Sequence, residues 1–128
     1  MNNKIKILIV DDDTDLLYLL TSKLKKGNIE CSTATQPGEG LQKAIQSPPD
    51  LVLLDLNLPK MSGFGFLREF KHHSELNKIP VVVLSAIEDQ EISEEAKSLG
   101  AVGYLTKKCS DKELLSVIHR YTGHVSVH

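Results

Sequence analysis

The sequence contains no tryptophan, only two cysteines and no hydrophobic run long enough to span a bilayer. Cys31 and Cys109 stand far apart and lack the spacing of metal ligands, so neither a structural disulfide nor a zinc site is expected. The amino terminus, Met1 to Lys4, lacks the apolar core of a signal peptide. These absences predict a cytoplasmic protein that has free thiols and does not associate with membranes.

A large excess of charge of either sign is also absent. The formal net charge is −2, and Lys and Arg do not gather into a stripe. Proteins that bind nucleic acids usually carry such a basic stripe, so direct contact with nucleic acid is not expected. The length of 128 residues and the 41% of hydrophobic residues suit one compact domain. We expect this domain to cover residues 1–128, with a folded core over about residues 4–122.

The sequence does contain an alternation of apolar runs with helical patterns. Strands that helices bury on both faces read as continuous apolar runs. Four such runs occur, at 7–10, 51–54, 81–84 and 102–106. A weaker strand over Glu30 to Thr35 suits the edge of a sheet. The pattern predicts an α/β fold, a three-layer α/β/α sandwich around a parallel sheet.

Helical patterns fill the intervals between these strands. Helices are predicted over Thr14–Lys26, over Pro37–Gln46, after Gly63, over Asp89–Leu99 and after the capping box Ser110-Asp111-Lys112-Glu113. Their apolar stripes should face the sheet: Leu17, Leu20 and Leu24; Phe64, Leu67 and Phe70; Ile92, Ala96 and Leu99; Leu114, Ile118 and Tyr121. Asp13 precedes the first helix and suits a helix cap.

Polar side chains follow the four apolar runs where each run ends. These side chains are Asp11, Asp12 and Asp13 after the first run, Asp55 after the second, Ser85 after the third and Lys107 after the fourth. The carboxyl ends of parallel strands meet at one edge of the sheet, where open α/β sheets bind their ligands. The sequence therefore predicts a site at this edge.

The chemistry of the predicted site follows from its crowded carboxylates, which repel one another unless a proton or a cation binds. Mg²⁺ suits such a site because it prefers oxygen ligands and typically uses one or two carboxylates together with phosphate oxygens. With a cation present, Asp55 would act as a nucleophile on phosphorus and form an acyl phosphate. Lys107 and Ser85 would hold the phosphoryl oxygens, since phosphoryl transfer depends mainly on positioning and charge.

These residues resemble those of the receiver domain of two-component response regulators, the family that includes the chemotaxis response regulator. The resemblance covers essentially the whole chain. It matches the acidic pair Asp11 and Asp12, the phosphoacceptor Asp55, the switch hydroxyl Ser85 and the lysine Lys107, together with Pro59, Met61 and Gly63 in the loop after the phosphoacceptor. It implies that the single expected domain is a receiver; since no linker is visible in the sequence, no output domain is expected in this chain. It also implies a doubly wound, flavodoxin-like sheet with the strand order 2-1-3-4-5.

The resemblance further implies the roles of the site residues. Asp12, Asp55 and the backbone carbonyl of Asn57 would bind Mg²⁺ directly, and Asp11 would act through water; Mn²⁺ is expected to substitute for Mg²⁺. Tyr104 corresponds to an aromatic residue that turns inward when the switch hydroxyl moves toward the phosphoryl group. The signal would then reach the face formed by the fourth helix, the fifth strand and the fifth helix.

The partners are likewise implied by the resemblance. A sensor histidine kinase or a histidine phosphotransfer protein would be the phosphodonor, and a downstream protein or an output domain would read the phosphorylated state. The chain would catalyse its own phosphorylation and dephosphorylation without turning over external substrates. Phosphorylation-dependent homodimers through the helical face near Tyr104 are a further expectation.

Lys108 departs from the family pattern, because receivers commonly carry proline after the conserved lysine. The Lys107–Lys108 peptide is expected to be trans, since a cis bond without proline costs about 3 kcal/mol. Lys108 also becomes a rival to Lys107 for binding phosphate. Cys109, two positions beyond Lys107, is a weak candidate for redox modulation, and nothing in the sequence lowers its pKa visibly.

Four other interpretations remain open. An aspartyl-phosphate phosphatase would usually carry a second acid where Asn57 stands. A degenerate receiver would act only as a docking module. A flavodoxin-like flavin binder is disfavoured, because the acids after Val10 would face the cofactor phosphate. A metal site at His72-His73 is disfavoured, because adjacent helix residues point in different directions.

Overall fold

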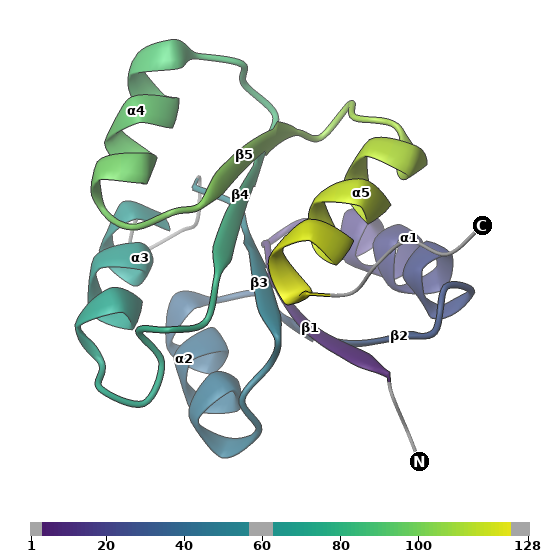
Figure 1. Cartoon of the computed structure of the whole chain (residues 1–128), viewed down its shortest axis with the longest axis horizontal. Helices are drawn as coiled ribbons and strands as arrows, with labels where there is room; N and C mark the ends of the chain where they lie inside the picture. The colour runs from purple at the N-terminus through teal and green to yellow at the C-terminus, as the bar shows by residue number, and fades with distance from the viewer. Residues whose placement is uncertain (1–3, 57–62, 124–128) are drawn as a thin grey trace.

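The computed structural model describes residues 4–56 and 63–123, which form five strands and five helices in strict alternation (Figure 1). The strands are β1 (Ile5–Val10), β2 (Ile29–Ala34), β3 (Leu51–Leu54), β4 (Val81–Ser85) and β5 (Gly103–Thr106). The helices are α1 (Thr14–Lys25), α2 (Pro37–Gln46), α3 (Gly63–His72), α4 (Gln90–Ser98) and α5 (Asp111–Thr122). The predicted alternation of strands and helices is confirmed.

The strands form one parallel sheet in the order β2-β1-β3-β4-β5, as predicted. The register places the strand ends level with one another: Val10 pairs with both Ala34 and Leu54, and Ser85 pairs with Thr106. The residues that follow these positions therefore emerge at the same carboxyl edge. This alignment is what brings the predicted site together.

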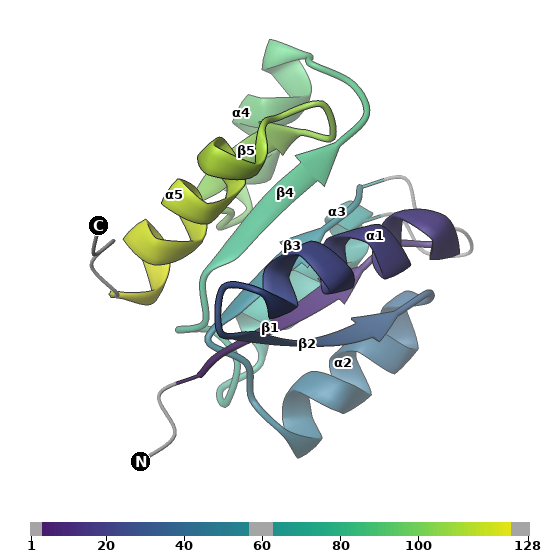
Figure 2. The same ribbon diagram turned by 90° about the vertical axis from the view of Figure 1, so that its right-hand side faces the viewer.

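Helices cover both faces of the sheet and make three layers. In Figure 1, α1 and α5 lie on one side of the sheet and α2, α3 and α4 on the other; Figure 2 views the molecule from the side of α1 and α5. Alternate residues of β1 point to opposite layers, so that Ile7 and Ile9 pack with α1 and α5, while Leu8 and Val10 pack with the other three helices. Each large aliphatic side chain buried in this way contributes about 1.5–3 kcal/mol.

The helix starts follow from local hydrogen bonds that the sequence predicted. The side chain of Asp13 accepts a hydrogen bond from Leu16 N at 3.1 Å, which caps α1. Ser110 and Glu113 form a reciprocal capping box at the start of α5. Such a cap typically stabilises a helix by about 1 kcal/mol. Asp13 is thus a cap, and only Asp11 and Asp12 remain for the acidic pair.

Strand β5 differs from the sequence-based expectation. We expected it to be covered on both faces, but all four of its residues are only partly buried, and the preceding Val102 is 38% exposed. The reason is its position at the edge of the sheet, next to α4. Helix α4 buries only Ala96 fully, while Ile92 and Leu99 are partly buried.

Two other helix faces also differ in detail. Helix α3 buries Phe66 as well as the predicted Leu67 and Phe70, and the ring of Phe66 stacks on that of Phe70 at 5.5 Å. Phe64 is only partly buried. Tyr121, predicted to face the core, is partly buried and donates its hydroxyl to the carbonyl of Val102.

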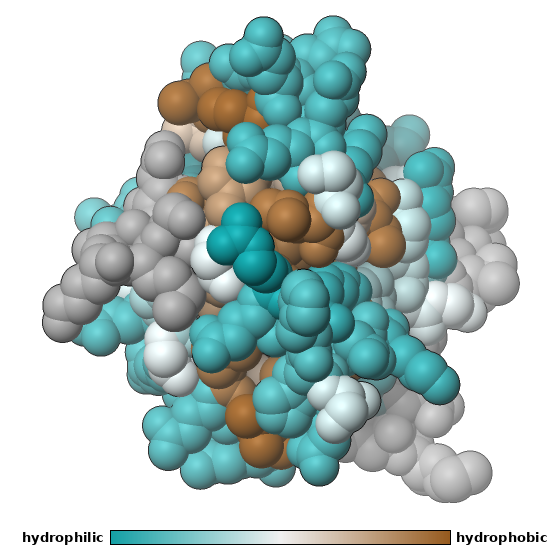
Figure 3. All heavy atoms as spheres, turned by 90° about the vertical axis from the view of Figure 1, so that its left-hand side faces the viewer, coloured by the Kyte–Doolittle hydropathy of each residue, from teal (hydrophilic) through white to brown (hydrophobic). Residues whose placement is uncertain are grey.

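The surface over α2, α3 and α4 is mostly hydrophilic. Figure 3 shows the apolar side chains of this side in separate areas between polar ones. None of the helices in the described part of the chain has the length and hydrophobicity needed to cross a membrane.

Candidate functional site

Three carboxylates meet at the carboxyl edge of the sheet. Asp11 follows β1, Asp55 follows β3, and Asp12 lies beside them; one oxygen from each lies within 4.8 Å of the other two. Asp11 and Asp55 are buried, at 2% and 4% exposure, whereas Asp12 is exposed. The predicted convergence of acids is confirmed, and one side of the cluster opens to solvent.

Backbone hydrogen bonds hold both buried acids in place. Asp11 N donates to the carbonyl of Ala34 at 3.0 Å, and Asp55 N donates to the carbonyl of Val10 at 2.9 Å. These bonds continue the sheet ladder by one residue beyond the strand ends. Asp13 N donates to Asp11 Oδ1 at 2.9 Å and orients that carboxylate. The acids are therefore positioned by the sheet rather than by a free loop.

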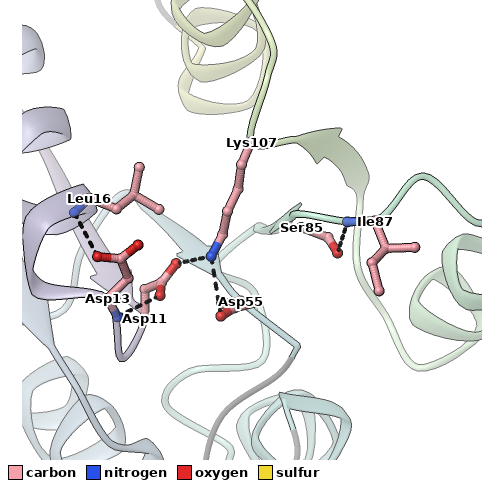
Figure 4. Close-up of polar contacts among 7 residues, drawn as sticks. All are labelled: Asp11, Asp13, Leu16, Asp55, Ser85, Ile87 and Lys107. Carbon is pink, nitrogen blue, oxygen red and sulfur yellow. Dashed lines mark hydrogen bonds and ion pairs between the residues drawn. The ribbon is translucent and has the colours of Figure 1, made fainter.

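Lys107 places its ammonium group among these acids (Figure 4). Its Nζ lies 2.7 Å from Asp11 Oδ2 and 3.4 Å from Asp55 Oδ2. Its backbone N donates to the carbonyl of Ser85 at 2.7 Å, which ties the residue to the end of β4. Lys107, and not the exposed Lys108, is thus the lysine that contacts the acids. Among the described residues no peptide is cis, so the Lys107–Lys108 bond is trans as predicted.

The electrostatics of the pair reflect both burial and charge. Burial raises the pKa of Asp11, and the charge of Asp55 raises it further, while hydrogen bonds from Lys107 and Asp13 N act in the opposite direction. Burial lowers the pKa of Lys107, but its hydrogen bond and attraction to Asp11, together with the charge of Asp55, raise the pKa above its ordinary value. An added positive charge nearby would therefore favour the ionised form of Asp11.

The donor set fits a hard divalent cation. All three side chains offer carboxylate oxygens, and the exposed Asp12 leaves room for the waters that Mg²⁺ usually keeps. With every group ionised, three carboxylates face one ammonium, and a divalent cation would balance the remaining negative charge. Asn57, predicted to supply a backbone carbonyl, lies outside the described residues.

Ser85 and Tyr104 lie at the other end of this edge and meet through one residue of the loop after β4. Ser85 is 3% exposed, and its Oγ accepts a hydrogen bond from Ile87 N at 3.1 Å. The carbonyl of Ile87 in turn accepts the hydroxyl of Tyr104. Figure 4 shows the Ser85 hydroxyl directed toward Ile87 rather than toward Asp55.

Ile87 was not identified from the sequence as the link between Ser85 and Tyr104. Its contacts with Ser85 and Tyr104 use only its backbone N–H and carbonyl, which every residue except proline offers. The side chain of Ile87 is 48% exposed and carries no polar group that would have marked it. No pattern in the sequence signals such a connection.

The weaker candidates are occupied in other ways. His72 Nδ1 lies 2.7 Å from the carbonyl of Arg68, and His73 Nδ1 accepts a hydrogen bond from Glu75 N at 3.2 Å. In the described ranges, the one group of three side chains able to hold a metal ion is the acid cluster. Burial and nearby acids raise the pKa of Cys109, which keeps its thiol protonated and argues against redox modulation.

Comparisons with known proteins agree with this geometry. The model of the response regulator receiver domain matches residues 7–119. Protein PilH of Pseudomonas aeruginosa is 34% identical over 114 residues, which cover 89% of this chain and 94% of PilH. The probable chemotaxis protein CheY of Rhizobium etli is 32% identical over 121 residues, or 94% of each chain. The solved structure of the chemotaxis protein CheY4 of Vibrio cholerae superimposes with a TM-score of 0.87 at 30% identity, covering 92% of this chain and 98% of CheY4.

Some relatives are longer than this chain. It spans only 45% of the alkaline phosphatase synthesis transcriptional regulatory protein PhoP of Bacillus subtilis, to which it is 32% identical over 109 residues. The similarity to PilH and CheY, by contrast, extends over nearly their whole length. Because the family model covers most of the sequence and the fold and the acidic pocket agree with it, the chain belongs to the family of response regulator receiver domains of two-component signalling.

Proposed function

We propose that Asp55 accepts a phosphoryl group from a histidine kinase or a histidine phosphotransfer protein and thereby switches this domain. A carboxylate oxygen of Asp55 forms the new bond to phosphorus, while the bond from phosphorus to the donor nitrogen breaks. The observation that carries the proposal is the meeting of Asp11, Asp12 and Asp55 at the carboxyl edge, with Lys107 in contact with Asp11 and Asp55. Three acids and one lysine in this position are suited to phosphoryl transfer, which depends on positioned charge.

The acids would bind Mg²⁺, or Mn²⁺ in its place, and the cation would neutralise the phosphoryl oxygens during transfer. Asp12 and Asp55 would be direct ligands, together with the carbonyl of Asn57, and the buried Asp11 would contribute through water. Asp11 is already held by Asp13 N and Lys107, which leaves its carboxylate less free to turn toward a ligand. The exposed Asp12 provides the open side from which a phosphodonor would approach.

Lys107 would hold an oxygen of the bound phosphoryl group. Its Nζ already lies 3.4 Å from Asp55 Oδ2 and is anchored through its backbone to Ser85. An ammonium group near the acceptor atom offsets negative charge as it accumulates there. These groups allow the domain to catalyse its own phosphorylation and later hydrolysis, so that it acts as a switch and does not turn over external substrates.

The phosphorylated state would be read through Ser85 and Tyr104. A phosphoryl group on Asp55 offers new acceptors for the Ser85 hydroxyl, and a hydroxyl that turns toward them stops accepting from Ile87 N. The carbonyl of Ile87 accepts a hydrogen bond from the hydroxyl of Tyr104. A shift of Ile87 would therefore also move Tyr104. The surface formed by α4, β5 and α5 would change in consequence, and a downstream protein, an output domain or a second copy of the domain would recognise it.

The test is phosphorylation of the Asp55→Asn variant with acetyl phosphate and Mg²⁺. Labelling should be abolished, because the amide is not a nucleophile toward phosphorus. Asp13→Asn is a matched control: the residue lies next to the acid pair but caps α1, and asparagine caps equally well. This control should label at the wild-type rate. Undiminished labelling of Asp55→Asn would exclude Asp55 as the acceptor.

A second measurement separates a working switch from a docking module that has lost its chemistry. Beryllofluoride should bind the wild-type protein only when Mg²⁺ is present, and Asp55→Asn should not bind it. A domain that shows no Mg²⁺-dependent binding would be a docking module. Sustained hydrolysis of an external phosphomonoester would instead support an aspartyl-phosphate phosphatase.

A further inference from the structure

Helix α3 begins in direct contact with the backbone that follows the phosphoacceptor. Gly63 N donates a hydrogen bond to the carbonyl of Leu56 at 2.8 Å. A Cβ atom added to Gly63 would lie 2.3 Å from Leu56 Cα, 2.7 Å from the carbonyl oxygen of Asp55 and 3.0 Å from the carbonyl carbon of Leu56. All three atoms belong to the backbone, so no side chain can rotate away to make room.

This contact gives the backbone around Asp55 a second attachment besides the sheet. Asp55 N donates to the carbonyl of Val10 in β1. The carbonyl of Asp55 and the backbone of Leu56 lie against Gly63. Leu56 itself is 6% exposed and belongs to the core beneath α3. The backbone that carries the acceptor is therefore in contact both with β1 and with the first residue of α3.

The distances show what any side chain at this position would do. Real Cβ atoms essentially never come closer than 3.0 Å to another heavy atom, but a Cβ at residue 63 would lie 2.3 Å from Leu56 Cα. To make room for this Cβ, the backbone at residue 63 or at Leu56 must move by about 0.7 Å, the difference between these two distances. Functional groups must be held to within about 0.5 Å of their working geometry. A displacement of this size at Leu56 would be passed on to the adjoining Asp55.

We propose that Gly63 is a positioning residue for phosphoryl transfer: its lack of a side chain lets α3 hold the Asp55 carboxylate at the distance from Asp11 and Asp12 that cation binding requires. The inference rests on the proposed role of Asp55. It adds a residue that touches neither the cation nor the phosphoryl group and acts only through the backbone of Asp55 and Leu56.

Gly40 provides a matched control within the same layer. A Cβ added there would lie 3.0 Å from Val10 Cγ2 and 3.1 Å from Phe66 Cε2, which is also tight, but these neighbours are side chains of the core. Alanine at position 40 should therefore destabilise the fold without displacing the backbone of Asp55. Gly38, with no atom within 4 Å of an added Cβ, is a second control without any packing cost.

The experiment compares Gly63→Ala, Gly40→Ala and Gly38→Ala with the wild-type protein. Mg²⁺ affinity is measured by calorimetry, labelling by acetyl phosphate is measured at saturating Mg²⁺, and folding is followed by circular dichroism. Gly63→Ala should bind Mg²⁺ at least about 10-fold more weakly, the loss typical when a group that orients a metal ligand is disturbed. It should also label more slowly, while both controls keep the wild-type affinity. A folded Gly63→Ala variant with wild-type affinity and labelling rate would overturn the proposal.

Amide hydrogen exchange in the wild-type protein keeps the test decisive if Gly63→Ala does not fold. If cation binding and the Gly63 contact hold the same peptide, Mg²⁺ should slow exchange of the Gly63 amide more than that of Gly40, whose N–H donates to the carbonyl of Gln36 within the helical region. Equal effects on the two amides would contradict the proposal. A wild-type protein that neither binds Mg²⁺ nor labels would instead refute the function proposed for Asp55.

Discussion

The two halves of the carboxyl edge are built differently. In the acid half, at the ends of β1 and β3, Asp11 and Asp55 are buried and each is fixed by a backbone hydrogen bond that extends the sheet. In the hydroxyl half, at β4 and β5, the hydroxyls of the buried Ser85 and the partly buried Tyr104 are linked through the backbone of the exposed Ile87. Segments with few buried contacts and exposed hydrogen bonds open at low free-energy cost. The acid half is thus suited to holding charge, and the hydroxyl half to changing its arrangement.

The position of each strand in the sheet explains the difference. Strands β1 and β3 each have a neighbour on both sides, as does β4, which ends at Ser85, whereas β5, which carries Tyr104, is an edge strand paired with β4. Helix α4 beside it buries only Ala96 fully. Tyr104 on this edge strand is only partly buried, whereas Ser85, at the end of the central strand β4, is buried like the two acids. Within the hydroxyl half, the edge strand therefore gives Tyr104 more freedom to move than Ser85.

The largest expected effect is the loss of Mg²⁺ binding when the exposed acid Asp12 is replaced. Asp12→Asn should weaken Mg²⁺ binding by about 100-fold, because loss of a direct ligand should cost at least as much as loss of a group that orients one. Stability without Mg²⁺ should change by no more than about 0.5 kcal/mol, because Asp12 is exposed. Calorimetric titration and thermal unfolding test both statements. Wild-type Mg²⁺ affinity in this variant would remove Asp12 from the ligand set.

The same experiment in the hydroxyl half should give the opposite result. Ser85→Ala should leave Mg²⁺ affinity within about twofold of wild type, because Ser85 Oγ contacts Ile87 N and not the acids. Beryllofluoride should still bind, but the NMR shift changes that it causes at Ile87, Tyr104 and α4 should be lost. If those changes persist in Ser85→Ala, the signal does not pass through the hydroxyl.

How far the sequence predicts each half depends on the kind of interaction involved. The acid half was predictable, because continuous apolar runs mark the strands and the parallel sheet brings their ends together. Asp13 and Ser110 were predictable as caps, since capping is a local interaction within a few residues. The closest contact of Lys107 was not predictable: it lies nearer to Asp11 than to Asp55, a difference set by side-chain packing.

The hydroxyl half depends on contacts that leave no trace in the sequence. Tyr104 and Ile87 are 17 positions apart and meet through a backbone carbonyl. The contact of Gly63 with Leu56 is likewise between backbone atoms, although a glycine at the first position of a helix hints at a close approach. The predicted apolar stripe of α3 contains Phe64 and not Phe66. In the structure Phe66 is buried and Phe64 is only partly buried. Such details are decided by the packing of α3 on the sheet.

A pH titration should distinguish the two halves further. The pKa of Asp11 is raised above 3.8 in the folded protein, mainly by burial, so folding favours its protonated form. That contribution to stability is complete below pH 3.8 and is lost as the pH rises through the raised pKa. Without Mg²⁺, the contribution of Asp11 should therefore fall with rising pH in this window.

The variant Asp11→Asn isolates this contribution, since an amide does not titrate. The difference in unfolding free energy between wild type and Asp11→Asn should change with pH in the window above pH 3.8, and Mg²⁺ should reduce the change by stabilising the ionised acid. Ser85→Ala should not alter the profile, because serine does not titrate there. Denaturant unfolding at a series of pH values provides the measurement. A pH-independent difference between wild type and Asp11→Asn would contradict the assigned pKa direction.

The smallest expected effect concerns the hydroxyl of Tyr104, and a second tyrosine makes its test specific. Tyr104→Phe removes the hydrogen bond to the carbonyl of Ile87, and Tyr121→Phe removes the bond to the carbonyl of Val102. Each should lower the free energy of unfolding by about 1 kcal/mol, the usual net value of one hydrogen bond. Only Tyr104→Phe should weaken the response of Ile87 to beryllofluoride, because the Tyr121 hydroxyl donates to the carbonyl of Val102 instead. Equal responses in the two variants would show that the hydroxyl half transmits through packing of the tyrosine ring, and that the bond to Ile87 serves stability alone.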